Sequence, residues 1–215
     1  MSMRSIECGV PSDAVDTIIG VSGGRVVCLA MTALRKPLMS VDEFIAWADR
    51  QPEQWELFNG VPAAMSPERV IHGETKYRIA RALDEAIAKA GVKCRFVLDS
   101  AAVRIDAQNS YQPDVMVYCG EPVSGDALVI ANPVIVVEVL SPGNAVKDLR
   151  DKLRGYFRVP SVQHYLIADP DTRVVIHHAR GHDDVVATRI VSEGSIVLDP
   201  PGLTLTLTAV FSAAS

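Results

Sequence analysis

Two carboxylates, Asp114 and Glu138, each lie at an apolar run of the chain, and Lys152 follows them. Asp114 precedes residues 115–117 (Val-Met-Val), and Glu138 lies near the end of the Val- and Ile-rich run 133–140. Such runs are typical of strands buried on both faces, where an ionised carboxylate is costly unless a cation compensates it. Two acids on neighbouring strands with a lysine nearby are what metal-assisted hydrolysis of a phosphodiester requires.

Each acid taken alone has an equally good structural explanation. Pro113-Asp114 is a common turn opener, and Glu138 lies three residues before the turn signal that begins at Ser141. A strand that emerges into solvent would carry an acid at either place. The combination of both acids with Lys152 is what favours a site.

The separation of the acids suits a shared metal ion. Glu138 follows Asp114 by 24 residues, enough for a strand, a loop and a return strand alongside. Mg²⁺ is a hard ion that keeps several waters, so one or two protein carboxylates and a substrate phosphate can hold it. We therefore expect Asp114 and Glu138 to bind Mg²⁺, with Mn²⁺ as a substitute.

Lys152 is expected on a helix over about residues 145–158. It lies next to the apolar stripe of Leu149 and Leu153, so its side chain can point toward the ends of the strands and assist attack by water. The alternative is an ordinary exposed helical ion pair between Asp148 and Lys152, which are four residues apart.

The composition predicts one globular domain and leaves most classes of function open. The 215 residues are 48% hydrophobic and 22% charged, which is ordinary for a folded protein. The net charge of -5 argues against a protein that coats nucleic acid by charge alone, although a nuclease with a local basic helix stays compatible.

The four cysteines, Cys8, Cys28, Cys94 and Cys119, form no close pair in the sequence. Neither a zinc spacing nor a compact disulfide framework can be drawn from them, so we expect reduced, mostly buried thiols of a cytoplasmic protein. The chain shows no transmembrane run and no signal peptide, so no membrane association is expected.

The first third of the chain carries clear local signals. Residues 40–43 (Ser-Val-Asp-Glu) form a capping box that opens a short helix. Asn59-Gly60 predicts a hairpin with Glu56 on its first strand. A long amphipathic helix is expected from a cap at Ser66-Pro67 to a stop at Gly91. Its core face is predicted to carry Tyr77, Ala80, Leu83 and Ile87, and its solvated face Lys76, Arg78 and Arg81.

The remaining elements predict an α+β fold with a mixed sheet. Strand-like stretches lie at 94–98, 102–105, 115–118, 133–140, 164–168 and 174–177 and near Ile190, Ile196 and Leu203. Residues 1–33 are expected to be a poorly ordered tail before a domain over 34–215. Their Gly-rich stretch 20–25 lacks the ending of a phosphate loop. Met31 is a hypothetical natural start, which N-terminal sequencing of the native protein would test.

Several motifs in order resemble the Uma-two family of restriction endonucleases, within the PD-(D/E)xK nuclease superfamily. The resemblance covers roughly residues 35–211. It rests on Pro113-Asp114, Glu138 to Pro142, Asp148, Lys152, Tyr156 and His164 to Pro170, and on an N-terminal signature of Glu56 to Gly60, Met65 to Pro67 and His72.

The resemblance implies a restriction-endonuclease-like core, a mixed four-stranded sheet flanked by helices and extended by extra strands. It implies that Asp114 and Glu138 bind the metal and that they and Lys152 are catalytic. The superfamily's lysine usually stands two residues after the second acid, where this chain has Leu140. Lys152 on the next helix then supplies the lysine, with Lys147 as the fallback.

Glu56 and His72 match the family pattern as auxiliary residues. Glu56 is a candidate for a second metal or a ligand water, or alternatively pairs with an arginine such as Arg104. His72 is as well explained by a structural role as by substrate contact. The pair His177-His178 is expected at the surface rather than at a metal site, because adjacent strand residues point to opposite faces.

The leading hypothesis is a metal-dependent endonuclease acting on nucleic acid, with DNA the expected substrate and a homodimer a further hypothesis. A non-catalytic nucleic-acid or protein-binding module on the same fold is the alternative, because fold does not determine function. A hydrolase acting on a small phosphorylated or carbonyl substrate is a third reading, without a phosphate loop or nucleophile motif to support it.

Overall fold

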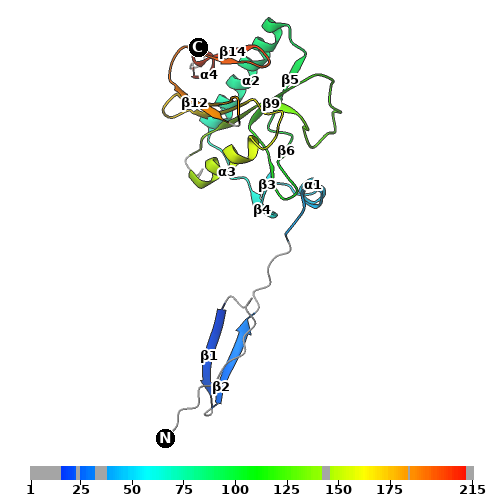
Figure 1. Cartoon of the computed structure of the whole chain (residues 1–215), viewed down its shortest axis with the longest axis vertical. Coiled ribbons are helices and arrows are strands. Elements are labelled where there is room, and N and C mark those ends of the chain that lie inside the picture. Colours follow the sequence, from blue (N-terminus) through cyan, green and yellow to red (C-terminus); the bar gives the residue numbers. More distant parts are fainter. Residues whose placement is uncertain (1–15, 23–24, 32–37, 142–145, 184, 212–215) are drawn as a thin grey trace. The chain divides into compact units, whose positions relative to one another are not determined.

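The computed structural model describes residues 16–22, 25–31, 38–141, 146–183 and 185–211 and divides the chain into two compact units, Met1–Pro37 and Leu38–Ser215 (Figure 1). The first unit contains an antiparallel hairpin of β1 (Asp16–Ser22) and β2 (Arg25–Met31). The second unit contains every other element. The expectation that residues 1–33 are poorly ordered stays a prediction, and two residues of the Gly-rich stretch, 23 and 24, lie outside the described part.

A mixed six-stranded sheet forms the centre of the second unit. Its strand order is β12 (Val186–Val191), β11 (Val174–Arg180), β10 (His164–Asp169), β9 (Pro133–Val139), β8 (Val115–Cys119) and β5 (Cys94–Leu98). Only β9 and β10 pair in parallel, and the chain between them contains α3 (Val146–Tyr156). All but one residue of β9 are buried, as its Val- and Ile-rich sequence predicts.

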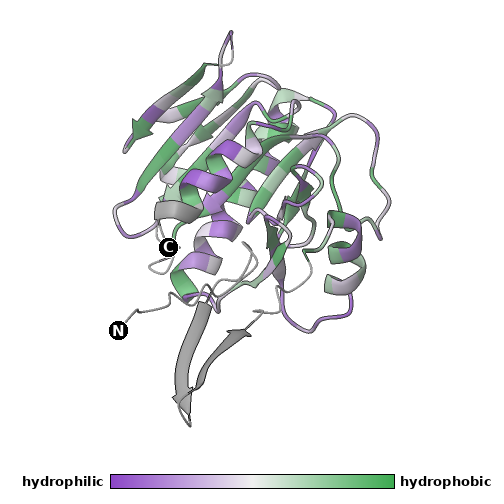
Figure 2. Ribbon diagram, turned by 60° about the horizontal axis from the view of Figure 1, so that its bottom comes forward, coloured by the Kyte–Doolittle hydropathy of each residue, from purple (hydrophilic) through white to green (hydrophobic). Residues whose placement is uncertain are grey.

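Two hydrophobic cores lie on the two faces of this sheet, because side chains alternate along each strand. Val115, Val117 and the odd-numbered residues of β9 pack with the long helix α2 (Val70–Ala90). Met116 and Val136 pack with Tyr156 and the partly buried leucines of α3. Figure 2 shows the resulting pattern, with green hydrophobic strands and a helix banded in purple and green.

The predicted bounds and face of α2 are partly wrong. It ends at Gly91, in the left-handed region at φ 65, as predicted, but begins at Val70 after Arg69, which makes no side-chain cap. Glu68 bonds to Lys76 instead of capping the helix. Tyr77 is 62% exposed, whereas Lys76 is only 2% exposed. The buried stripe thus continues from Leu83 and Ile79 into polar residues.

A smaller four-stranded sheet carries Glu56. Its order is β4 (Val61–Ala64), β3 (Trp55–Phe58), β7 (Ser110–Tyr111) and β6 (Val103–Arg104). The hairpin of β3 and β4 turns at Asn59 and Gly60, both with positive φ, as the sequence predicts. The predicted capping box is also present, with Ser40 and Glu43 at the start of α1 (Val41–Ala48).

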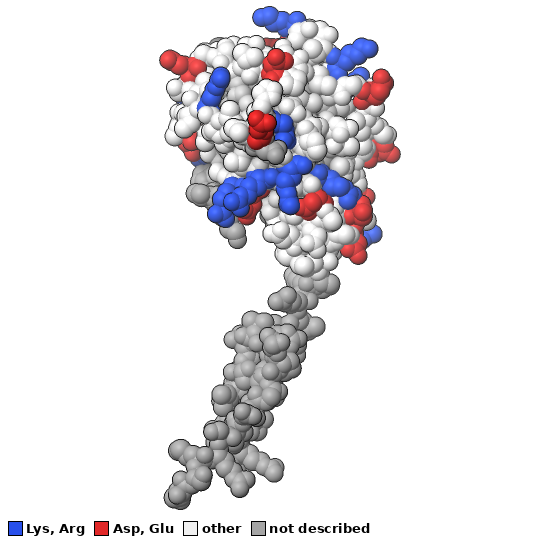
Figure 3. All heavy atoms as spheres, in the orientation of Figure 1, with Lys and Arg blue, Asp and Glu red and all other residues white. Residues whose placement is uncertain are grey.

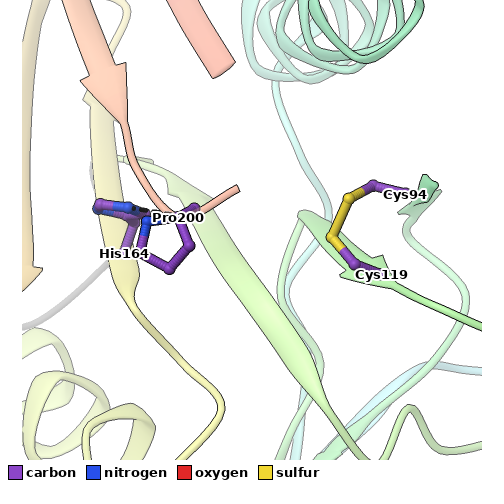
Figure 4. Close-up of a disulfide and its surroundings, with 4 residues drawn as sticks. All are labelled: Cys94, Cys119, His164 and Pro200. Atoms are coloured by element: carbon purple, nitrogen blue, oxygen red, sulfur yellow. Dashed lines mark hydrogen bonds between the residues drawn. A yellow bond between two sulfur atoms is a disulfide. The ribbon is translucent and has the colours of Figure 1, made fainter. Parts of the chain in front are cut away.

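The expectation of reduced, unpaired cysteines is wrong for Cys94 and Cys119, which form a disulfide (Figure 4). The two residues are 25 apart in sequence but directly opposite each other in the antiparallel register of β5 and β8, with Cα atoms 3.9 Å apart. Sequence spacing hides a pair that strand pairing creates. Cys8 and the side chain of Cys28 lie outside the described residues.

A histidine cluster, defined here as His164, His177 and His178, lies within the sheet and contradicts the expected surface position of His177-His178. The three are 4%, 5% and 8% exposed. His164 Nε2 donates to the Pro200 carbonyl at 3.0 Å (Figure 4). Its Nδ1 therefore accepts from His177 Nε2, also at 3.0 Å. His178 Nδ1 lies 2.8 Å from the Thr188 hydroxyl. Adjacent residues do point apart, but both faces are covered.

The hairpin of β13 (Ser195–Leu198) and β14 (Leu203–Thr206) and the short helix α4 (Leu207–Phe211) add Leu198, Leu203, Leu205 and Val210 to the core beside α2. Among the described residues, no helix has the length and apolar character needed to cross a membrane.

Candidate active site

Strand pairing brings Asp114 and Glu138 together. Val115, the first residue of β8, pairs with Val137 of β9, and Asp114 directly before it accepts from the Val139 amide beside Glu138. The two acids are 3% and 4% exposed. The sequence expectation of a strand, a loop and a return strand alongside is therefore met at the strand ends where the acids stand.

Asp114 is held by groups from α2 and from β9. Its Oδ1 accepts from Lys76 Nζ at 2.8 Å, its Oδ2 accepts from the Val139 amide at 2.5 Å, and His72 Nε2 lies 3.7 Å from Oδ2. His72 Nε2 also lies 2.5 Å from the Val139 carbonyl. The N-terminal half of α2 thus contributes a histidine and a lysine, four residues apart and on one helix face, to the first acid.

Glu138 points to the opposite helix. Lys152 Nζ of α3 lies 3.0 Å from Glu138 Oε1 and 3.0 Å from Glu56 Oε1, and it is only 5% exposed. Tyr156, one turn further along α3, donates its hydroxyl to Glu138 Oε1 at 2.6 Å. Lys152 is therefore a buried bridge between two carboxylates, so the alternative of a solvent-exposed helical lysine does not hold.

Glu56 belongs to this group rather than to Arg104. Its Oε1 also accepts from the Gln112 amide at 2.9 Å, which ties β3 to the segment that leads to Asp114. Arg104 instead pairs with Asp42. Of the other sequence candidates, Lys147 lies on α3, but its side chain and that of Asp148 are outside the described residues.

Burial and like charge act together on Glu138. Its complete burial raises the pKa, Lys152 counteracts this, and the carboxylates of Asp114 and Glu56 raise it further, with a net upward shift. The pKa of Glu138 is raised even though Lys152 contacts this carboxylate. One lysine therefore does not fully compensate the burial of Glu138 and the neighbouring negative charges. Perturbations of this kind concentrate at functional sites.

These side chains surround a cavity of about 310 Å³. Four carboxylates, called here the cavity acids, line it together with Lys152 and His72, and Lys76 contacts two of these acids from α2. The wall is completed by Phe58, Ala63, Ala64, Met65, Ser66, Val139 and Ser141. The cavity acids are Glu56, Glu68, Asp114 and Glu138. Negative charge therefore exceeds the positive charge that Lys76 and Lys152 supply.

The sequence reading missed Glu68 and Lys76. Glu68 appeared to be a first-turn helix acid, but its Oε1 accepts from Lys76 at 2.5 Å and its Oε2 lies 2.8 Å from His72 Nδ1. Lys76 was placed on the solvated face. The signal that would have found it is its phase, because His72, Lys76, Ile79 and Leu83 follow one stripe of the helix.

The donor set fits a divalent cation. One ligand atom each from Glu68, His72 and Asp114 lies within 4.8 Å of the other two. Carboxylate oxygens suit Mg²⁺ and Mn²⁺, and an imidazole nitrogen favours a first-row transition metal such as Mn²⁺. Three of the acids here, Glu56, Asp114 and Glu138, are buried, and such an ion would balance their charge.

The fold and this arrangement of acids and lysine define a restriction-endonuclease-like α+β protein. The Uma2 family, described as "Putative restriction endonuclease", matches residues 41–210, and the chain belongs to this family. The match covers every helix of the second unit except the last residue of α4.

The chain is also similar to two relatives and to one solved structure. Two uncharacterized proteins of Synechocystis sp. (strain ATCC 27184 / PCC 6803 / Kazusa), slr1290 and sll1609, are 26% and 24% identical. Those alignments cover 81% and 77% of this chain and 92% and 94% of the relatives. A crystal structure titled as a putative nuclease belonging to DUF820, from Anabaena variabilis ATCC 29413, has the same fold with a TM-score of 0.64 at 17% identity. It covers 81% of this chain, which covers 98% of it.

Proposed function

We propose that the protein is a divalent-metal-dependent endonuclease that hydrolyses phosphodiester bonds, with DNA as substrate. The observation that carries the proposal is the cavity itself, where Asp114, directly before β8, and Glu138, on β9, both line the wall and Lys152 bridges Glu138 to Glu56. Membership of a restriction endonuclease family supports the reaction class.

Asp114 and Glu138 hold Mg²⁺, or Mn²⁺ in its place, in this proposal, and His72 and Glu68 extend the set of ligands. The sequence predicts Asp114 and Glu138 as metal ligands, and the structure groups Asp114 with Glu68 and His72. Asp114 belongs to both sets. A bound divalent ion supplies charge stabilisation for the phosphoryl oxygens and the leaving group.

Lys152 orients the attacking water and balances developing negative charge. Its ammonium is fixed by two carboxylates, so little reorganisation is needed when the substrate enters. Tyr156, one turn after Lys152 on α3, holds the Glu138 carboxylate by donating its hydroxyl to it. Glu56 acts through Lys152 and through the Gln112 amide, which makes it a positioning residue.

Local positive charge supports a nucleic-acid substrate despite the net charge of -5. The outer side of α3 and the residues after it carry exposed Arg150, Arg154 and Arg158. Figure 3 shows Lys and Arg side chains gathered in a band across one face of the second unit. Arginines at such spacing can contact successive phosphates of a nucleic-acid backbone.

A cleavage screen tests the proposal. Wild-type protein is incubated with double-stranded DNA, single-stranded DNA and RNA in Mg²⁺, Mn²⁺ or a chelator, beside Glu138→Ala. We expect metal-dependent cleavage of DNA by the wild type only. Cleavage that persists in Glu138→Ala contradicts the assignment of Glu138 to the metal site. Cleavage of RNA alone would show that the substrate is RNA and not DNA.

Calorimetric titration with Mn²⁺ separates the enzyme from a non-catalytic binding module on the same fold. The enzyme is expected to bind the ion and to lose that binding in Asp114→Asn, with circular dichroism confirming that the variant is folded. A wild type that binds nucleic acid but no metal ion favours the module.

A further inference from the structure

Lys76 is enclosed by three carboxylates. Its Nζ lies 2.5 Å from Glu68 Oε1, 2.7 Å from Asp99 Oδ1 and 2.8 Å from Asp114 Oδ1, and the residue is 2% exposed. The acids come from three separate segments, before α2, after β5 and before β8. An ammonium group has three donors, so each oxygen receives one. Such a shell of oxygens is also what a hard cation takes.

The charge of Lys76 is kept although the residue is buried. Three carboxylate oxygens within 2.8 Å of Nζ compensate the positive charge of the buried ammonium. Asp99 is also tied to Asp114 directly, because its backbone N–H donates to the Asp114 carbonyl at 3.1 Å. Lys76 therefore behaves as a fixed cation.

The lysine and the candidate metal ligands share two acids but use different oxygens. Lys76 takes Oε1 of Glu68 and Oδ1 of Asp114. His72 faces the other two oxygens, with Nδ1 2.8 Å from Glu68 Oε2 and Nε2 3.7 Å from Asp114 Oδ2. One side of each carboxylate is thus occupied by the ammonium, and the other side is turned toward His72.

We propose that the Lys76 ammonium takes the place of a second metal ion, so that the cavity binds one divalent ion per chain. Lys76 is then a positioning residue that turns the second oxygen of Glu68 and of Asp114 toward that ion. The inference rests on the proposed function, because it presupposes that the cavity binds a divalent ion at all.

Removing the ammonium leaves three carboxylates around its position, the buried Asp114 and the partly exposed Glu68 and Asp99. In Lys76→Ala, Glu68, Asp99 and Asp114 face a space from which the lysine side chain has been removed, and uncompensated buried charge is strongly unfavourable. A second Mg²⁺ or Mn²⁺ with its waters suits these oxygens. We therefore expect Lys76→Ala to bind two ions per chain. Lys89→Ala is the matched control, since Lys89 is an exposed lysine on the same helix.

The test is a count of bound Mn²⁺ by equilibrium dialysis and metal analysis, with thermal unfolding in chelator and in Mn²⁺. Wild type and Lys89→Ala are expected to bind one ion and Lys76→Ala two. In chelator, Lys76→Ala is expected to unfold at a lower temperature than wild type, and Mn²⁺ is expected to raise its midpoint by more than it raises that of wild type.

The outcomes are distinguishable. Two ions in the wild type, or one ion in folded Lys76→Ala, overturn the role of Lys76 while leaving the proposed nuclease intact. No bound ion in the wild type defeats the proposed metal-dependent function itself. If Lys76→Ala does not fold, Asp99→Asn replaces it: with the lysine still present, one ion supports the inference and two overturn it.

Discussion

Two regions of this molecule bury polar side chains among strands of the same sheet, and they do so in opposite ways. The histidine cluster has its ring nitrogens matched to one another, to the Pro200 carbonyl and to Thr188. The cavity acids outnumber the lysines that face them and open on a cavity of about 310 Å³. Buried neutral groups that bond to one another and to nearby polar groups are a structural solution, whereas retained, incompletely balanced charge indicates a place for a ligand.

Among variants of the cavity, substitution of Asp114 is expected to lower the cleavage rate most. Asp114→Asn keeps the shape but removes the charge that faces both Lys76 and the His72 side of the cavity. We expect cleavage to fall by on the order of 10³-fold, the upper range for loss of one electrostatic contact to the reacting centre. Initial rates of cleavage in Mg²⁺ measure this, and an unchanged rate would remove Asp114 from the site.

Lys152→Met is expected to lower cleavage by about 10²-fold, because it removes the ammonium that bridges Glu138 and Glu56. Binding of Mn²⁺ should persist, since Lys152 is not a ligand. Lys89→Met, which removes an exposed lysine of α2, is the control and should change the rate far less. Equal losses in the two variants would mean that the position of Lys152 does not matter.

Glu56→Gln is expected to cost about tenfold in cleavage, in the range for residues that orient a functional neighbour. The Gln side chain keeps an oxygen for the Gln112 amide but loses the charge that holds Lys152. A loss as large as that of Asp114→Asn would instead assign Glu56 a direct role with the metal ion.

The smallest effect on activity is expected in the histidine cluster, where pH should change stability. Burial, with smaller contributions from His164 and Arg189, lowers the pKa of His177 from 6.5 to about 4. Between these values the unfolded chain binds more protons, so the stabilisation is present above pH 6.5 and is lost as the pH falls through about 4. Urea unfolding from pH 7 to 4 should show a shallower decline for His177→Gln than for wild type. Parallel curves would contradict this.

The sequence alone predicts those structural elements that depend on residues close together in the chain. The capping box at Ser40, the hairpin at Asn59-Gly60 and the end of α2 at Gly91 are each fixed by residues within a few positions of one another. The both-sides burial of β9 follows from its composition. The order of acids and lysine along the chain was enough to identify the family.

Features that depend on tertiary pairing did not follow. The Cys94–Cys119 bond requires the register of β5 and β8. Lys76 is a charged residue of the kind that usually faces solvent on a helix. Its burial is favourable only because Glu68, Asp99 and Asp114 contact it in the folded chain. His177 and His178 are both buried, and each contacts a side chain of a neighbouring strand, His164 for His177 and Thr188 for His178.

The most direct test of the central claim compares the two regions on one substrate. Wild type, Glu138→Gln and His177→Gln are assayed together for cleavage of the same labelled duplex DNA in Mg²⁺, with circular dichroism establishing that all three are folded. We predict that wild type and His177→Gln cleave the DNA at similar rates and that Glu138→Gln does not. Cleavage by Glu138→Gln at the wild-type rate would contradict the account.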